Sequence, residues 1–220
     1  DYIGVPVDRG GGWRSLSLEN TFNAPDGSAI PTIIPAEIDE RGAVTVATAM
    51  LDQGAGTHTA MRVVAAEELK IPLEQTGIET LDTSAVGPDT GIGASRGTRI
   101  FGNATRLAAA DARQRLLAAA SEVLGVGQEE LSLSGDGRVA ALSGRSVSYA
   151  DLVRSNGSAI RGAGFYKNFE SGPEAALCVQ VAEVDVDPET GQIKLTHFTS
   201  AHSTGTVLNP LMHQGQIDGG

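Results

Sequence analysis

The sequence predicts an α+β fold in which mixed sheets and β-hairpins combine with two to four helices, and three observations indicate it. Two β-rich runs, "TIIPAEID" and "AVTVATAM", flank the short turn "ERG", a pattern typical of a hairpin. Two segments with helical character follow, "HTAMRVVAAEELK" and "ATRLAAADARQRLLAAASEVL". Beyond Gly164 the chain becomes β-rich again. This order favours an α+β fold over a regular parallel sheet.

The two long helices are predicted from periodicity, composition and end signals. In the first helix, apolar residues recur at helical spacing: Met61, Val64, Ala65 and Leu69. Pro72 ends this helix, because a proline cannot donate the next backbone hydrogen bond. The second helix is rich in strong helix formers and closes at Gly125, which suits a left-handed cap. Between the two, "TGIETLD" predicts a short strand.

Shorter elements follow the second helix. Asp136 and Gly137, within "LSLSGDGRVAAL", predict a strand-turn-strand unit. Ser148 is expected to cap a short helix that has Asp151 in its first turn. The runs "EAALCVQVAEVDVD" and "QIKLTHFTSAH", joined by "PETG", predict a long hairpin with an acidic turn.

We expect three regions along the chain. Residues 1–35 predict an irregular N-terminal segment, because its first part is rich in Gly, Pro, Asn, Asp and Ser. Residues 36–145 predict a first α/β lobe that carries two glycine-rich loops. Residues 146–220 predict a segment rich in β-hairpins.

Charge and cysteine content limit the classes of function. The formal net charge is −11 and no cluster of Lys or Arg stands out, which argues against nucleic-acid partners and favours a small uncharged substrate or a bound cofactor. We interpret the single cysteine, Cys178, as a small buried core residue, consistent with a reduced compartment. No segment approaches the roughly 18 consecutive apolar residues of a membrane span. The first residues lack the build of a signal peptide, so we expect a cytoplasmic protein and leave a periplasmic location open.

Two loops rich in glycine and hydroxyl residues, each placed before a predicted helix, are the best candidates for a binding site. They span residues 54–59 and residues 91–98. A helix N-terminus leaves backbone N–H groups unpaired and carries the positive end of the helix dipole, so it suits a phosphate or another anion. We therefore expect two such loops in one domain to bind one anionic cofactor from two sides.

Purely structural roles for the same residues stay open. Gly54, Ala55 and Gly56 also suit a strand-to-helix turn that needs positive φ. The hydroxyl of Ser95 also suits an N-cap. The chain has no "GxSxG" around Ser95, and neither "GxGxxG" nor "GxxxxGK[ST]" occurs in the required strand-to-helix context.

Neither the histidines nor the acidic pairs predict a metal or catalytic site. The histidines, whose spacing fits no compact zinc site, are His58, His197, His202 and His213. His58 lies in the first loop, where it either reaches a ligand or faces solvent. The acidic residues that alternate in a predicted strand, and that most simply share its solvated face, are Glu183, Asp185 and Asp187.

Three ordered motifs resemble a known family. They lie in "DQGAGTHTA", in "GASRGT" and in "AHSTGTVLNPLMHQGQIDGG". Together they resemble the molybdopterin-binding large subunit of the xanthine dehydrogenase and aldehyde oxidase family, over roughly residues 36–220. In that family a "GQG" turn, an "ASxxT" or "GSRST" loop and a "DxGxxxNP…GQxEG" segment approach the pterin cofactor. The resemblance implies that this chain is part of the two-lobed molybdopterin-binding domain.

The resemblance also implies individual site residues. Ala55 stands where the family has a glutamine, so that glutamine's side-chain hydrogen bonds are lost here. Gly97 stands where a serine is common, and Ser203 replaces a frequent aspartate. The residues implied to contact the cofactor are Gly54, Ala55, Gly56, Thr57, Ala94, Ser95, Arg96, Gly97, Thr98 and Gln216.

The function implied by the resemblance is that of one part of a molybdenum hydroxylase. The cofactor would be molybdopterin or molybdopterin cytosine dinucleotide with molybdenum, and the reaction oxidative hydroxylation of an aldehyde or N-heterocycle. The implied partners are the remainder of the large subunit and subunits or domains that carry iron–sulfur and flavin groups. The family's glutamate base lies in a "GEP"-like segment that these 220 residues do not include, so we expect them to be inactive alone. Two alternatives are a non-catalytic structural or binding domain with a degenerate site, and a stand-alone anion-binding protein.

Overall fold

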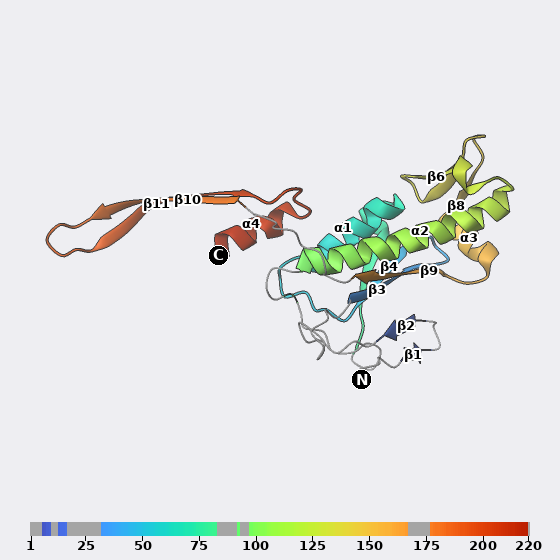
Figure 1. The fold of residues 1–220 in the computed structure, drawn as a ribbon, viewed down its shortest axis with the longest axis horizontal. Coiled ribbons are helices and arrows are strands. Elements are labelled where there is room, and N and C mark those ends of the chain that lie inside the picture. Colours follow the sequence, from blue (N-terminus) through green and yellow to red (C-terminus); the bar gives the residue numbers. More distant parts are fainter. Residues whose placement is uncertain are drawn as a thin grey trace. The chain divides into compact units, whose positions relative to one another are not determined.

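The computed structural model describes residues 6–9, 13–16, 32–82, 92, 97–166 and 177–219 (Figure 1). It contains two compact units, Asp1–Phe169 and Glu170–Gly220. The described residues form four α-helices together with parallel and antiparallel strands, which confirms the predicted α+β class.

The first unit is built on a mixed four-stranded sheet with the order β5-β4-β3-β9. Its strands are β3 (Thr32–Ile38), β4 (Val44–Thr48), β5 (Thr76–Thr80) and β9 (Ile160–Tyr166). β3 pairs antiparallel with both β4 and β9, which confirms the predicted β3–β4 hairpin, and β4 pairs parallel with β5. Two further strands, β1 (Pro6–Arg9) and β2 (Trp13–Leu16), pair antiparallel within the region predicted to be irregular.

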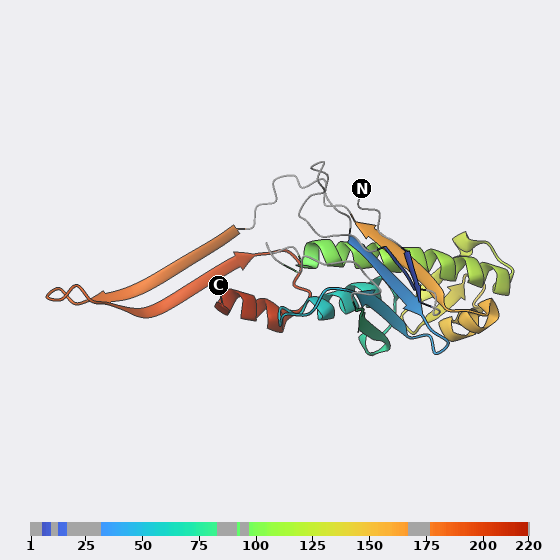
Figure 2. The same cartoon turned by 90° about the horizontal axis from the view of Figure 1, so that it is seen from below.

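Two helices lie side by side on one face of this sheet. α1 (Thr57–Leu69) contacts β4 and β5, and α2 (Asn103–Leu124) contacts β3 and β9, while the helices also contact each other (Figures 1 and 2). α2 ends at Gly125, whose φ of 65° confirms the predicted left-handed cap. α1 ends at Leu69, because Lys70 already adopts a left-handed conformation with φ 49° before Pro72 is reached.

The backbone of β9 lies directly against the backbone of α2. Gly162 and Gly164 share one face of β9 and meet a row of buried alanines, Ala104, Ala108 and Ala112. A Cβ on Gly164 would overlap the Ala104 carbonyl oxygen and would lie 2.5 Å from the Ala108 amide nitrogen. α2 also covers the outer edge of β9, because the Ala163 N–H donates to Asp111 Oδ2 over 3.0 Å. Only glycines permit so close an approach between a strand and a helix.

Gly164→Ala should therefore destabilise the protein by about 2–3 kcal/mol or more, since a backbone atom must move to admit the methyl group. Chemical denaturation measures this loss. The matched control is Gly135→Ala, because a Cβ on Gly135 would meet nothing within 4 Å, and its effect should stay within about 0.5 kcal/mol. Equal effects of the two substitutions would contradict the close approach of β9 to α2.

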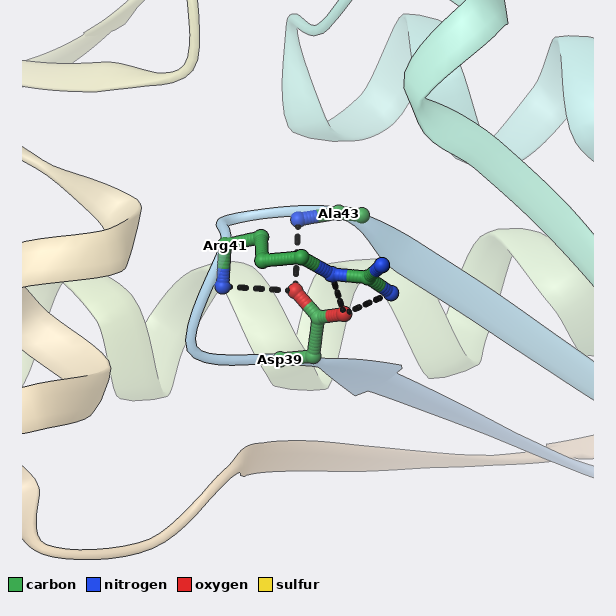
Figure 3. Close-up of polar contacts among 3 residues, drawn as sticks. All are labelled: Asp39, Arg41 and Ala43. Carbon is green, nitrogen blue, oxygen red and sulfur yellow. Dashed lines mark hydrogen bonds and ion pairs between the residues drawn. The ribbon is translucent and has the colours of Figure 1, made fainter.

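The turn between β3 and β4 is organised by Asp39 (Figure 3). Its Oδ1 accepts hydrogen bonds from the N–H groups of Arg41 (2.8 Å) and Ala43 (3.0 Å), and its Oδ2 accepts one from Arg41 Nε (2.9 Å). Partial burial acts to raise the pKa of Asp39, but these hydrogen bonds and the charge of Arg41 outweigh it and lower the pKa below its usual value. Gly42, with φ 80°, packs this turn against Tyr149 and Ala150.

The contribution of Asp39 to stability should depend on pH. Since its pKa is lower in the folded state, the stabilisation is present above the unfolded pKa of about 3.9 and is lost as the pH falls through the folded pKa. At pH 7, Asp39→Asn should lower the free energy of unfolding by less than about 1 kcal/mol, because the group is partly screened by solvent. Denaturation of both proteins between pH 7 and pH 2.5 should show this difference shrinking. A constant difference would contradict the assignment.

A second, three-stranded sheet packs on the C-terminal part of α2. It consists of β6 (Leu131–Ser134), β7 (Arg138–Ala141) and β8 (Ser146–Ser148), and α3 (Tyr149–Asn156) follows it. The Ser148 hydroxyl accepts a hydrogen bond from the Asp151 N–H over 3.1 Å, which confirms the predicted cap. The buried Tyr149 hydroxyl donates to the Leu69 carbonyl over 2.6 Å. Burial is the main cause that raises the pKa of Tyr149, and the negative charge of Asp136 is the second. Short 3-10 helices span Leu73–Gln75 and Gln128–Glu130.

The second unit contains the predicted long hairpin and a helix. β10 (Leu177–Val186) pairs antiparallel with β11 (Ile193–Ser203), and α4 (Pro210–Gly219) follows. In the acidic turn, Asp187 Oδ1 accepts from the N–H groups of Glu189 and Thr190, and the Glu189 bond is the main cause that lowers the Asp187 pKa. Asp187 thus lies in the turn, while Glu183 and Asp185 lie in β10 opposite His197 and Lys194.

The expectation that Cys178 is a buried core residue is wrong. Its thiol is free and exposed, because β10 pairs with β11 alone in the described structure and this two-stranded ribbon is exposed on both faces. The predicted division into three regions stays a prediction, and the two compact units have their boundary elsewhere. The expected boundary between residues 145 and 146 lies between β7 and β8, which pair with each other, whereas the contacts separate the units after Phe169.

Candidate functional site

The two strands that precede the candidate loops end at the same edge of the first unit's sheet. β4 and β5 are parallel, and the first loop follows β4 while the chain that leads to the second loop follows β5. The Leu81 N–H donates to the Thr48 carbonyl over 2.9 Å, which holds the two strand ends together. In open parallel sheets ligands usually bind outside the carboxyl ends of the strands, and β4 and β5 form the parallel pair of this mixed sheet.

The first loop makes the turn from β4 into α1 with two left-handed glycines. Gly54 has φ 88° and Gly56 has φ 72°, so the predicted need for positive φ is confirmed. α1 begins at Thr57, so Thr57 is its first residue and is buried. Gly54 is exposed, a Cβ built on it would meet nothing within 4 Å, and Ala55 is half-buried. The backbone around Gly54 and Ala55 is therefore open to an approaching ligand.

The N–H groups that were predicted to bind an anion are directed to a carboxylate of the chain itself. Asp52 Oδ1 accepts from the Gly54 N–H over 3.1 Å and from the Gly56 N–H over 3.2 Å. Asp52 Oδ2 lies 3.4 Å from the backbone nitrogen of His58, a longer and weaker contact. Asp52 is a part of this site that the motifs did not single out. The available signal was its residue type, since Asp preceding a glycine turn and a helix is a common cap.

His58 has a partner within the chain, and a contact with a ligand stays a prediction. Its side chain is half-buried and Nε2 lies 2.7 Å from the Met50 carbonyl oxygen. The Met50 N–H in turn donates to the Thr48 hydroxyl over 3.1 Å. The imidazole thus ties the first turn of α1 back to the end of β4.

The second loop leads into α2 through a π-helical segment, Gly97–Gly102. Ala94, Ser95 and Arg96 lie outside the described residues, so their assignment stays a prediction. Gly97 is buried and Thr98 is exposed.

The two loops meet at Thr57 and Gly97. A Cβ on Gly97 would lie 3.1 Å from the Thr57 hydroxyl oxygen and 3.3 Å from Ile92 Cγ2, so the absent side chain lets the second loop lie close to the first turn of α1. Further along both helices, Arg113 of α2 forms an ion pair with Glu68 of α1 over 3.2 Å. The start of α1 thus lies beside the segment that leads into α2, and the end of α1 lies beside the middle of α2. The two helices therefore run in the same direction, and their N-termini lie at the same end of the unit.

Gln216, the third predicted contact, lies in α4 of the second unit and is exposed. The side chain of Asn209 caps α4, since its Oδ1 accepts from the Met212 N–H over 3.3 Å, and Pro210 takes the first helical position. The structure brings Thr57 and Gly97 together within the first unit and describes Gln216 within the second.

No group of three or more His, Cys, Asp or Glu side chains that could hold a metal ion occurs among the described residues. None of the helices in this part of the chain is long and apolar enough to cross a membrane.

An α+β domain with two glycine-bearing loops at the carboxyl edge of its parallel strands has the build of a cofactor-binding domain. A family model described as the molybdopterin cofactor-binding domain matches residues 13–220. The chain belongs to this family.

Curated relatives and a solved structure agree with the family. The chain is 32% identical over 202 residues to the probable hypoxanthine oxidase XdhD of Escherichia coli K12, which covers 87% of this chain and 21% of that protein. It is 30% identical over 194 residues to the nicotine 6-hydroxylase large subunit of Paenarthrobacter nicotinovorans, covering 84% of this chain and 24% of that subunit. The structure of reconstituted CO dehydrogenase from Oligotropha carboxidovorans shares the fold, with a TM-score of 0.74 and 24% identity over 86% of this chain and 24% of that one. The chain thus spans about a quarter of the length of these proteins or less.

The contact between the loops can be tested with a double-mutant cycle. Gly97→Ala alone places a methyl group 3.1 Å from the Thr57 hydroxyl oxygen, and Thr57→Ala removes that oxygen. Gly97→Ala should therefore be less destabilising in the Thr57→Ala protein, by about 0.5–1 kcal/mol of coupling free energy measured by chemical denaturation. Strictly additive effects would show that the two loops are not in contact.

Proposed function

We propose that this chain is part of the large subunit of a molybdenum hydroxylase and supplies one wall of its molybdopterin site. The observation that carries the proposal is the contact of the first loop with the second at Thr57 and Gly97. It brings two family motifs, far apart in the sequence, to one end of α1 and α2. The family match over residues 13–220 supports this reading and does not favour the alternative of a non-catalytic domain with a degenerate site.

The described residues fit a cofactor that meets them through hydrogen bonds rather than through a metal cluster. Around Gly54 and Ala55 the backbone is open, and Thr98 and Gln216 expose a hydroxyl and a carboxamide. Gly54, Ala55, Gly56, Thr57, Gly97, Thr98 and Gln216, together with Ala94, Ser95 and Arg96, would bind and orient the cofactor. When bound, the cofactor supplies the redox chemistry for oxidative hydroxylation of an aldehyde or N-heterocycle. The residues of this chain hold and orient it.

Several finer features belong to the same proposal. The cofactor would be molybdopterin or its cytosine dinucleotide, and iron–sulfur and flavin groups on partner subunits or domains would carry the electrons away. The glutamate base would be supplied by a part of the large subunit outside these 220 residues, which would be inactive alone. A cytoplasmic location stays a prediction, and a periplasmic one stays open.

The full-length protein should contain molybdenum and pterin. Metal analysis by mass spectrometry, and fluorescence of the oxidised pterin released on denaturation, measure both. A pure preparation that oxidises an aldehyde or N-heterocycle but holds neither molybdenum nor pterin would contradict the proposal.

Ala55→Gln should test whether the first loop faces the cofactor. Because Ala55 is only half-buried and its neighbour Gly54 is exposed, we expect a change in unfolding free energy within about 0.5 kcal/mol and a changed absorption or paramagnetic resonance spectrum of the cofactor in the full-length protein. Ala118→Gln makes the same chemical change at a half-buried position in the C-terminal half of α2 and should leave the spectrum unchanged. If both variants have the spectrum of the wild type, the first loop does not contact the cofactor.

A further inference from the structure

The N-terminus of α1 is the natural anion site of the first loop, and a carboxylate of the chain already lies there. Gly54 and Gly56 are both left-handed, and their N–H groups converge on Asp52 Oδ1 at 3.1 and 3.2 Å. The other carboxylate oxygen lies 3.4 Å from the backbone nitrogen of His58, within the first turn of the helix. Backbone N–H groups arranged in this way form a concave anion-binding nest, and here they enclose a side chain.

This arrangement changes what the loop can bind. A phosphate that approached the start of α1 would find the N–H groups of Gly54 and Gly56 already donating, and it would meet the negative charge of Asp52. The open part of the loop is instead the backbone around Gly54 and Ala55. This surface offers neutral peptide groups.

We propose that Asp52 is a positioning residue that takes the place of a ligand phosphate at the N-terminus of α1. Its carboxylate holds Gly54 and Gly56 in their left-handed conformations, so that the loop presents its backbone to an uncharged, hydrogen-bonding part of the ligand, such as the edge of a fused heterocycle. The phosphate groups of the ligand bind elsewhere. The identity of the ligand rests on the proposed function, whereas the role of Asp52 as an internal anion does not.

Hydrogen exchange of the full-length protein tests this role, with inorganic phosphate as the probe. Asp52→Gly removes the carboxylate and should speed exchange of the amides of Gly54, Gly56 and His58 by about tenfold or more, because charge-assisted hydrogen bonds are lost. Adding phosphate, at constant ionic strength set by chloride, should slow this exchange back toward the wild-type rate. In the wild-type protein phosphate should have no effect on these amides.

Two further variants keep the test decisive. Asp52→Asn retains an accepting oxygen without the charge, so it should give an intermediate exchange rate even if Asp52→Gly fails to fold. Glu122→Gln removes one negative charge from an exposed position on α2 and should match the wild type. Unchanged exchange in both Asp52 variants, or protection of the wild-type amides by phosphate, would overturn the proposal.

The pterin content of the same preparations separates this inference from the proposed function. If Asp52 positions the loop for a pterin, Asp52→Gly should lower the pterin content of the full-length protein while Glu122→Gln leaves it unchanged. Phosphate-sensitive exchange in Asp52→Gly with no pterin even in the wild type would retain Asp52 as an internal anion and reject the proposed function. Normal pterin content in Asp52→Gly, despite the altered exchange, would reject the positioning role.

Discussion

The close approach of α2 to β9 determines where the second loop can lie. Gly162 and Gly164 leave no side chain between the strand and the alanine row of α2, so the helix axis lies nearer the sheet than larger residues would allow. The Asp111 carboxylate adds a directional contact by accepting the Ala163 N–H at the edge of β9. With α2 held in this way, its π-helical start reaches the first turn of α1, and the absent side chain of Gly97 lets the two segments touch.

The direction of the two helices has a chemical consequence for the site. Because α1 and α2 run in the same direction, the positive ends of both helix dipoles lie at one end of the first unit. An anion would ordinarily be attracted there. Asp52 offsets this field at α1 and satisfies the amides of Gly54 and Gly56. At the first loop, therefore, the charge of the chain itself opposes the binding of an anion.

Much of the fold could be predicted because its signals are local. The caps at Gly125 and Ser148, and the β3–β4 and β10–β11 hairpins, depend on residues within one turn or on strict alternation. The parallel pairing of β4 with β5 and the packing of β9 on α2 bring together segments that are distant in the sequence. Local sequence patterns therefore do not predict these contacts. Gly162 and Gly164, alternating in a strand, were the available hint of close backbone approach. Cys178 was misjudged because apolar composition does not show whether a strand has a second layer. For the site, the motifs located both loops, but the partner of the first loop's amides, Asp52, depends on the three-dimensional course of the turn and was not predicted.

The account's central claim is that both loops face one cofactor. The most direct measurement compares hydrogen exchange at residues 54–60 and 97–103 in the full-length protein with and without its cofactor. The account predicts that exchange slows in both segments together when the cofactor is present, while the second sheet, β6 to β8, remains unchanged. Slowing in only one of the two segments, or in neither, would contradict it.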